Sequence, residues 1–454
     1  MPMQNSRDIG RLAERLIDAS EADETEVSLG SGAERFVRFA DSGPTQSADR
    51  NWQSVSIRAR FQGDDGWREA RADCDGSCEA RALGALERAT ILARMAPPNP
   101  EARALGGAVD VREQVADEAT ASFPFEEMAP WVQMATAACT DAGLAPAGLI
   151  QCRSAEGRLV NSAGREVACS SSRAGFCLTA SSPDFKTSAG FADAIHSRVG
   201  DLDAEAVVRR AVSKALAGAQ PQNIEPGEYT VVLEPNAVSA LLLFASYAGF
   251  GAQEVAEESS FLCGREGQQI FPESLQIADD AHNEFHPGCP YDGEGWPRQP
   301  VQLVDAGRVG TPVTDSKWAA KLGLPNTGHG LAMPNTSGPI PMNLVLSAGE
   351  QSLAELIGGV EHGLLITQFH YTNLIDPKDL LLTGMTRNGT FRIEKGEIGP
   401  AVKNLRFTES FVKAFGSITG IGSEREVAGA LFEGEVICPA LRIENFRFTS
   451  STDF

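Results

Sequence analysis

The chain has 454 residues, of which 42% are hydrophobic and 22% charged, a composition typical of a globular protein with two or three domains. Its formal net charge of −22 comes from 61 acidic and 39 basic side chains. Because nucleic-acid affinity depends mostly on Lys and Arg that neutralise phosphates, direct binding to DNA or RNA is disfavoured. The longest uncharged apolar stretch, 237–252, is shorter than the ~20 residues that span a bilayer, so no membrane segment is expected.

Cysteine usage and the start of the chain indicate a reducing compartment. The nine cysteines are an odd number and are scattered, which is typical of thiols that stay reduced. Leu12, Ala13 and Leu16 recur at helical spacing, so we expect an amphipathic helix there and not an export signal. Cys74 and Cys78 have no second ligand pair nearby, which favours a turn over a zinc site. A cytoplasmic protein is therefore expected.

Two similar units are predicted before residue 223. In residues 1–105, EVSLGSG, RFVRFADSG and SVSIRARFQG alternate like strands, and CEARALGALERATILARM follows with helical spacing until two prolines end it. In residues 106–222, a linker helix precedes similar alternating segments and a second helix that ends at Pro221. This pattern predicts an N-terminal domain of duplicated units, each a β-meander followed by a helix.

A β-rich domain is predicted for residues 223–454. The strand EPGEYTVVLEP is followed by NAVSALLLFASYAGFGAQEVAEESSFL, which has the pattern of one continuous helix with Asn236 as its N-cap. Short strands separated by many Gly and Pro residues come after it. The overall fold class is therefore predicted as α+β, with a C-terminal barrel-like or strongly curved sheet packed against one main helix.

The end of this helix, QEVAEE, places one amide and three carboxylates within residues 253–258. On a helix, Glu254, Glu257 and Glu258 share a face, where their oxygens could bind a hard cation such as Mg²⁺ or Ca²⁺. Like charges at this spacing cost only a few tenths of a kcal/mol, so an exposed helix end looks the same. From spacing alone, a metal site, a damaged metal site and a solvated helix end all remain open.

The histidines are the other candidate ligands, because the chain has only six. His282 and His286 lie four apart, but a Pro-Gly pair follows them, which favours a solvated loop over a metal site. His329 belongs to the Gly- and Pro-rich segment PNTGHGLAMPNTSGPIPMNL, which is long enough to cover or bind something. His370 and Thr372 share one side of a predicted strand whose edge could hold an extended peptide. His329, His370 and Thr372 are therefore peptide-binding candidates.

Four further segments together resemble the TldD/PmbA family. They are IEPGEYTVVLEPNAV, YDGEGWPRQPVQLVDAGRV, NTGHGLAMPNTSGPIPMNL and LLITQFHYTNLIDPKDLLLTGMTRNGTFRIEKGEIGPAVKNLRFTES. The N-terminal RFVRFADSGPTQSADRN is also similar to that family, so the resemblance covers nearly the whole chain. The family was once named for modulation of DNA gyrase and is now regarded as peptidase-related.

The resemblance also indicates what QEVAEE is. In the TldD branch, the corresponding helix carries His-Glu-x-x-x-His, in which the two His bind zinc, the Glu is the general base, and a C-terminal Cys completes the site. In this chain the two His positions fall on Gln253 and Glu258, and the Glu position falls on Glu254. The Cys would lie in a Gly-rich turn around ITGIGSEREVAG, which has no cysteine, while Cys438 is expected to be a buried structural thiol. The expected zinc ligands are therefore missing, and no metal is assigned to this chain.

By this resemblance, the chain is a metal-less subunit of the PmbA/TldE type. It would form a cytoplasmic complex with a zinc-bearing TldD-like partner, although a homodimer is also possible. The complex would cleave unstructured peptides, either to remove leader peptides in peptide maturation or to degrade them. One alternative is an independent metal-dependent hydrolase that uses Glu254 and Glu258 with another ligand. A second alternative is a stand-alone peptide-binding module.

Overall fold

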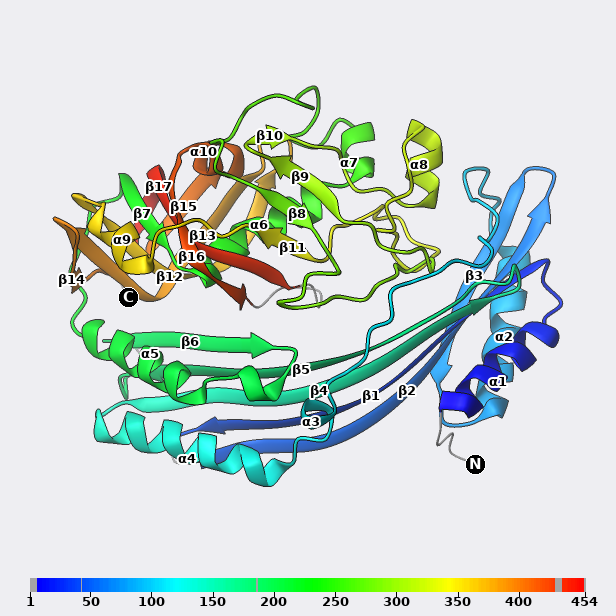
Figure 1. The fold of residues 1–454 in the computed structure, drawn as a ribbon, viewed down its shortest axis with the longest axis horizontal. Coiled ribbons are helices and arrows are strands. Elements are labelled where there is room, and N and C mark those ends of the chain that lie inside the picture. Colours follow the sequence, from blue (N-terminus) through cyan, green and yellow to red (C-terminus); the bar gives the residue numbers. More distant parts are fainter. Residues whose placement is uncertain (1–5, 42, 185–186, 429–434, 453–454) are drawn as a thin grey trace.

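The computed structural model describes residues 6–41, 43–184, 187–428 and 435–452. A six-stranded sheet is built from the N-terminal part and an eleven-stranded sheet from the C-terminal part (Figure 1). Among the described residues, no helix has the length and apolar character needed to cross a membrane.

The N-terminal part consists of two successive groups of strands and helices. The first group is α1 (Ser6–Asp18), β1 (Glu24–Ala40), β2 (Gly43–Gly63), β3 (Gly66–Asp75) and α2 (Glu79–Met95). The second is α3 (Glu118–Ala121), α4 (Phe125–Asp141), β4 (Ala145–Asn161), β5 (Glu166–Ser181), β6 (Ala189–His196), a 3₁₀ turn (Val199–Asp201) and α5 (Ala204–Ala217).

The two groups join into one sheet in the order β3-β2-β1-β4-β5-β6. Each group is a β-meander, and the first strands of the two meanders, β1 and β4, pair antiparallel at the centre. Apolar residues at alternate positions, such as Val27 and Leu29, are buried under α1 and α2, while α4 and α5 cover the other end of the sheet. The predicted arrangement of duplicated meander-plus-helix units is confirmed.

The C-terminal part contains most of the strands. Its elements are β7 (Glu228–Leu233), α6 (Pro235–Ala248), α7 (Ala252–Ala256), β8 (Ile277–Asp279), β9 (Val301–Asp305), β10 (Arg308–Val309), α8 (Ser316–Leu322), β11 (Leu344–Leu346), α9 (Leu353–Gly358), β12 (His362–Asp376), β13 (Leu381–Glu394), β14 (Glu397–Ala401), β15 (Leu405–Ser410), α10 (Phe411–Gly416), β16 (Ile418–Ala428) and β17 (Val436–Ser451).

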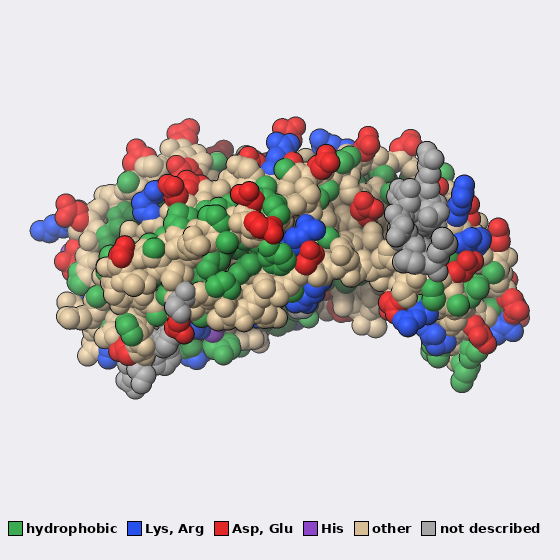
Figure 2. Space-filling view, turned by 90° about the horizontal axis from the view of Figure 1, so that it is seen from below, with side chains coloured by type: hydrophobic (Ala, Val, Ile, Leu, Met, Phe, Trp, Pro, Cys, Tyr) green, Lys and Arg blue, Asp and Glu red, His purple; other side chains and the backbone are tan. Residues whose placement is uncertain are grey.

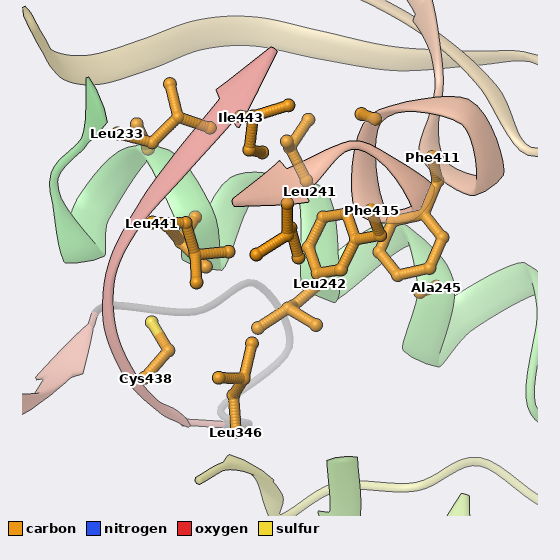
Figure 3. Close-up of a cluster of buried hydrophobic side chains, with 14 of the residues drawn as sticks. Leu233, Leu241, Leu242, Ala245, Leu346, Phe411, Phe415, Cys438, Leu441 and Ile443 are labelled. Atoms are coloured by element: carbon orange, nitrogen blue, oxygen red, sulfur yellow. The ribbon is translucent and has the colours of Figure 1, made fainter. Parts of the chain in front are cut away.

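The C-terminal sheet closes on itself. Strand β7 pairs with β12 on one side and with β17 on the other, so the path β17-β15-β13-β12-β7 forms a ring. The long helix α6 packs against the ring strands, and its Leu241 and Leu242 meet Leu441 and Phe415 in the main core (Figure 3). The predicted α+β class, with a strongly curved C-terminal sheet and one main helix, is confirmed.

The two parts meet along α5, β6 and the start of α6. Lys214 on α5 pairs with Glu234, and Arg210 pairs with Glu426 on β16. Asp193 on β6 accepts a hydrogen bond from Asn236 Nδ2 at 2.7 Å. These contacts fix the N-terminal end of α6 against the N-terminal sheet.

The lower face of the molecule carries mixed charges. Figure 2 shows red acidic and blue basic side chains interspersed over this face, with apolar side chains gathered between them. Both signs of charge thus occur side by side on this face.

Candidate functional site

The helix predicted to run through QEVAEE is broken, and the expectation of one continuous helix is wrong. Helix α6 ends at Ala248, and α7 begins only at Ala252. Between them the chain pairs with Val313, whose carbonyl accepts from Ala252 N at 3.0 Å and whose amide donates to Phe250 O at 3.0 Å. A Cβ on Gly249 would lie 2.6 Å from the ring of Phe261. Close packing of this segment therefore replaces helical hydrogen bonds with an isolated β-bridge to Val313.

The start of α6 also differs from the prediction. Its N-cap is Glu234 and Pro235 occupies the first turn, whereas Asn236 was expected to be the cap. Proline is favoured in the first turn because its missing amide hydrogen would have no helical partner there. The Asn236 side chain instead donates to Asp193 across the boundary between the two parts of the molecule.

The break separates the three positions of the zinc motif. Gln253 and Glu254 lie in the first turn of the five-residue helix α7, whereas Glu258 follows its C-cap in the left-handed conformation, with φ of 54°. Glu257 and Glu258 are exposed. The prediction that Glu254, Glu257 and Glu258 share one helical face is therefore wrong, because the helix ends before that face is complete.

Glu254 is the only one of these carboxylates with a clearly unusual environment. Its Oε2 lies so close to Gly251 that a Cβ there would be 2.1 Å away, so the side chain turns back over the N-terminus of α7. Burial raises the pKa of Glu254 to about 7, and the charge of Glu257 adds to that rise. A carboxyl group folded back over a helix start is a common stabilising arrangement.

The Gly- and Pro-rich segment lies directly over this turn. Gln253 Nε2 donates to Thr336 O at 3.2 Å, and a Cβ on Gly338 would lie 2.5 Å from Gln253 Oε1. Farther back along α6, Ser246 Oγ donates to Pro341 O. The fold thus brings QEVAEE and NTSGPIP, two motifs about 80 residues apart, into contact.

The residues around α7 do not fit a zinc ion. No group of three His, Cys, Asp or Glu side chains suited to holding a metal occurs in the part of the chain that the structure describes. Zinc in proteins is held by imidazole nitrogens, thiolates and carboxylates, whereas Gln253 offers only an amide. A single half-buried carboxyl such as Glu254 does not supply a coordination sphere.

The region expected to carry the missing Cys is a strand and not a turn. The segment ITGIGSEREVA forms β16, which pairs with β17 and shifts register between Ile421 and Arg425. The glycines thus lie in an irregular strand. Cys438 is on β17 with its thiol buried, and its Sγ donates to Pro235 O at 3.4 Å. Burial raises the pKa of Cys438, in agreement with the expected structural thiol.

His329 is enclosed in the protein. Its side chain has 0% exposure, its Nδ1 lies 2.9 Å from Thr327 Oγ1, and its Nε2 lies 2.9 Å from Asp279 Oδ1. The long Gly- and Pro-rich segment that carries His329 therefore lies over the C-terminal domain, and its His329 side chain faces inward. In this arrangement the ring has no surface available to a peptide.

His370 lies in a cleft of about 570 Å³ between β12–β13 and the N-terminal sheet. Arg387 Nη1 lies 2.9 Å from His370 Nδ1, and the neighbouring Tyr371 is 70% exposed. Burial and the Arg387 charge lower the pKa of His370. Peptide-sized ligands fit clefts of this volume.

In a regular strand Thr372 would face the same side as His370, but in β12 it does not. The pairing of β12 with β13 shifts between His370 and Asn373, and Tyr371 has φ of 51°, so the chain bulges there. A bulge breaks the period of two on which the prediction depended. The Thr372 Oγ1 is buried and has no hydrogen-bond partner among the described residues.

The predicted loop around His282 and His286 is present. His282 Nε2 lies 3.0 Å from Arg298 O, and His286 pairs with Glu435. Burial lowers the pKa of His286. The two imidazoles thus have separate protein partners.

Sequence analysis missed a group of buried carboxyl groups near His329. Asp279, Asp292 and Asp315 are all at most 3% exposed. Burial raises the pKa of Glu294 to about 7, helped by the charge of Asp292. Asp292 accepts from the backbone amides of Glu294, Trp296 and Gly330, so it organises the loop YDGEGWP. In the sequence, Asp292 and Glu294 of YDGEGWP could have indicated this group of carboxyl groups.

The fold and the site together define a metallopeptidase-related protein whose α7 turn lacks a zinc-ligand set. Residues 226–450 match the PmbA/TldA metallopeptidase C-terminal domain. Through these residues the chain belongs to the PmbA/TldD family, and the resemblance seen in the sequence is confirmed.

Curated relatives share about a quarter of the aligned residues. A metalloprotease of Methanothermobacter thermautotrophicus is 24% identical over 223 residues, 49% of each chain. The metalloprotease TldD homolog of Haemophilus influenzae is 26% identical over 233 residues, 50% of this chain and 48% of that protein. Metalloprotease PmbA of Escherichia coli O157:H7 is 24% identical over 215 residues, 47% of this chain and 45% of that protein. The chain thus matches about half the length of these relatives.

Solved structures share the fold over nearly the whole chain. TldE from Thermococcus kodakarensis superimposes with a TM-score of 0.85 at 20% identity, over 98% of this chain and 99% of that one. A proposed modulator of a DNA gyrase from Thermotoga maritima gives a TM-score of 0.82 at 19% identity, over 97% and 100%. At sequence identities of about 20%, this structural likeness shows a shared fold and does not by itself show a shared function.

Proposed function

We propose that this chain is a PmbA/TldE-like subunit without a zinc site of its own, which works with a zinc-bearing TldD-like subunit in a cytoplasmic metallopeptidase complex. The observation that carries the proposal is the state of the α7 turn. Gln253 is bound to the backbone of Thr336, and Glu258 lies past the end of the helix. The scaffold motifs around that turn are intact, while the residues expected to bind zinc are replaced.

Catalysis by Glu254 alone is not supported by its surroundings. A general base in a metallopeptidase acts on a water whose pKa the metal has lowered. Without ligands for such a metal, Glu254 has a structural role at the start of α7. The peptidase activity of the complex therefore belongs to the partner subunit in this proposal.

The role of this chain is then to help hold an unstructured peptide. Such substrates vary in sequence, so main-chain hydrogen bonds to strands are a suitable means of binding them. The cleft beside His370 is the favoured place, because it lies at the bulged end of β12 and has Tyr371 exposed at its rim. Leader-peptide removal and general peptide degradation both fit this role. The chain could also form a homodimer when the partner is absent.

Metal analysis combined with peptide cleavage tests the proposal. The purified chain should hold less than stoichiometric zinc and leave an unfolded peptide uncut. Addition of a TldD-like subunit should produce cleavage that a chelator abolishes. Robust chelator-sensitive cleavage by this chain alone would contradict the proposal.

One observation favours an independent metal-dependent hydrolase that uses Glu254 and Glu258. The pKa of Glu254, raised by burial to about 7, is a value suited to a general base at neutral pH. Glu254→Gln separates the two functions, because it should abolish an independent hydrolase and leave a non-catalytic subunit active in the complex. A stand-alone peptide-binding module would instead bind peptide tightly without gaining activity from any partner.

A further inference from the structure

A second pocket, of about 370 Å³, lies between the N-terminal sheet and the C-terminal domain. Strands β4 and β5 contribute Arg153 and Arg173, and the C-terminal domain contributes His286, Arg298 and Glu435. We call it the arginine pocket after its three guanidinium groups. None of the residues that line it belongs to α6 or α7.

Arg298 is the residue that points to a ligand. It is only 9% exposed, and neither its Nε nor its Nη1 has a hydrogen-bond partner among the described residues. Buried guanidinium groups normally have their donors satisfied, because an unpaired buried donor is costly. Arg298 thus contributes to the lining a guanidinium group whose Nε and Nη1 have no acceptor among the described residues.

The nearby carboxylates compensate the charge of Arg298 without using its donors. The pKa of Asp279 is lowered by His329 and by the charge of Arg298, whereas burial raises the pKa of Asp292 although the charge of Arg298 opposes that rise. Asp279, however, uses its two oxygens for His329 Nε2 and for the Asn343 amide. The oxygens of Asp292 accept from backbone amides. Asp279 and Asp292 thus provide negative charge near Arg298, while its Nε and Nη1 have no hydrogen-bond partner among the described residues.

Basic side chains outnumber acidic ones in the lining of the pocket. Glu435 is the single acidic side chain of the lining, and it already pairs with both Arg173 and His286. Three guanidinium groups therefore face one carboxylate. A cluster of three guanidinium groups in a chain of net charge −22 needs a specific reason.

We infer that the arginine pocket binds an oxyanion group, such as the C-terminal carboxylate of a peptide or a phosphate. The planar fork of a guanidinium matches two oxygens of either group and forms the stronger, charge-assisted class of hydrogen bond. The pocket volume is within the range of sites for small ligands. A peptide carboxylate would extend the proposed peptide-holding role, but oxyanion binding requires neither the partner subunit nor zinc.

Calorimetric titration of the purified chain tests this inference with three probes. N-acetyl-dialanine and its C-terminal amide differ only in the carboxylate, and inorganic phosphate is the third probe. The free acid or phosphate should bind at one site, with the amide about 10-fold weaker or more. Competition between acid and phosphate would place both in the same pocket. Binding of phosphate without the acid would identify a phosphate group as the source of the oxyanion.

Matched variants connect the binding to Arg298. Arg298→Gln should reduce affinity about 10-fold or more, and Arg298→Lys should recover only part of it because the fork is lost. Arg153→Gln, on the β4 side of the pocket, should also weaken binding. Arg94→Gln removes an exposed charge on α2 and should have no effect. Circular dichroism confirms that each variant is folded.

Two results would overturn the inference. One is that neither the acid nor phosphate binds the folded chain. The other is that folded Arg298→Gln and Arg153→Gln both keep the parental affinity within about twofold. Because the measurement involves neither zinc nor cleavage, its failure would be distinct from failure of the proposed subunit function.

Discussion

Cys169 Sγ on β5 lies 3.1 Å from Cys289 Sγ in the C-terminal domain, so two thiols 120 residues apart are in contact across the boundary between the two parts of the molecule. The hydrogen bond between them raises the pKa of Cys169 and lowers that of Cys289, so Cys289 is the thiol of the pair that ionises more readily. The odd cysteine count gave no indication of this pair.

We predict that the thiol-oxidising reagent diamide links Cys169 to Cys289. The two thiols give two electrons and two protons to diamide, which becomes a hydrazine, and a sulfur–sulfur bond forms. Peptide mapping by mass spectrometry should find this pair linked. The cross-link should raise the free energy of unfolding by about 2–4 kcal/mol, because it closes a long loop in the unfolded chain. Cys169→Ser should abolish the effect and Cys74→Ser should not, and absence of the linked peptide would refute the prediction.

The buried His329–Asp279 pair should contribute strongly to stability. Removal of His329 leaves the buried Asp279 carboxylate with only the Asn343 amide as a hydrogen-bond partner, which costs about 3–5 kcal/mol. We predict a loss of this size for His329→Ala in urea denaturation followed by fluorescence. His362→Ala, at an exposed position, is the control and should change stability by less than about 0.5 kcal/mol. Equal effects of the two substitutions would contradict the enclosed role of His329.

Glu254 should make stability depend on pH. Burial raises its folded-state pKa to about 7, above the ordinary value of 4.5, so the folded protein binds this proton more tightly than the unfolded chain does. The protonated Glu254 side chain makes its full contribution to the free energy of unfolding below about pH 4.3. This contribution is lost as the pH rises to about 7, because the buried group must then ionise. Glu254→Gln should therefore be close to neutral at pH 4 and stabilising by about 1–2 kcal/mol at pH 8.

Urea denaturation of parent and variant at the two pH values measures this difference. Glu257→Gln, at the exposed end of the same helix, is the matched control and should show a smaller pH dependence. A Glu254→Gln variant that is equally stabilised at both pH values would show that the carboxyl group does not titrate as described.

Gly251 should tolerate no side chain. A Cβ there would lie 2.1 Å from Glu254 Oε2 and 2.6 Å from Pro339 O, and the second of these is a backbone atom that cannot easily move. We predict that Gly251→Ala destabilises the fold by about 1–3 kcal/mol by pushing the covering segment off α7. Gly200→Ala is the control, since nothing lies within 4 Å of that position. Thermal unfolding of both variants distinguishes local crowding from a general effect of alanine.

Local sequence was enough to indicate many of the elements and their type. Alternation in EVSLGSG and SVSIRARFQG predicts strands because side chains in a strand point to opposite faces, and Val27 and Leu29 are indeed buried on one face. Helical spacing of Ala and Leu similarly indicated α2 and α5. The motifs also identified the family, since their residue types are tied to local turns and strands.

Tertiary structure alone decided how those elements become sites. The sequence of residues 237–258 has the period of one helix, but pairing of Gly251 with Val313 divides it, and Glu258 is removed from the face of Glu254. The arginine pocket draws its charges from strands and loops that are far apart in the chain. Periodicity reports which way a side chain faces within its own element, whereas burial, pKa and partners depend on segments that are distant in the chain.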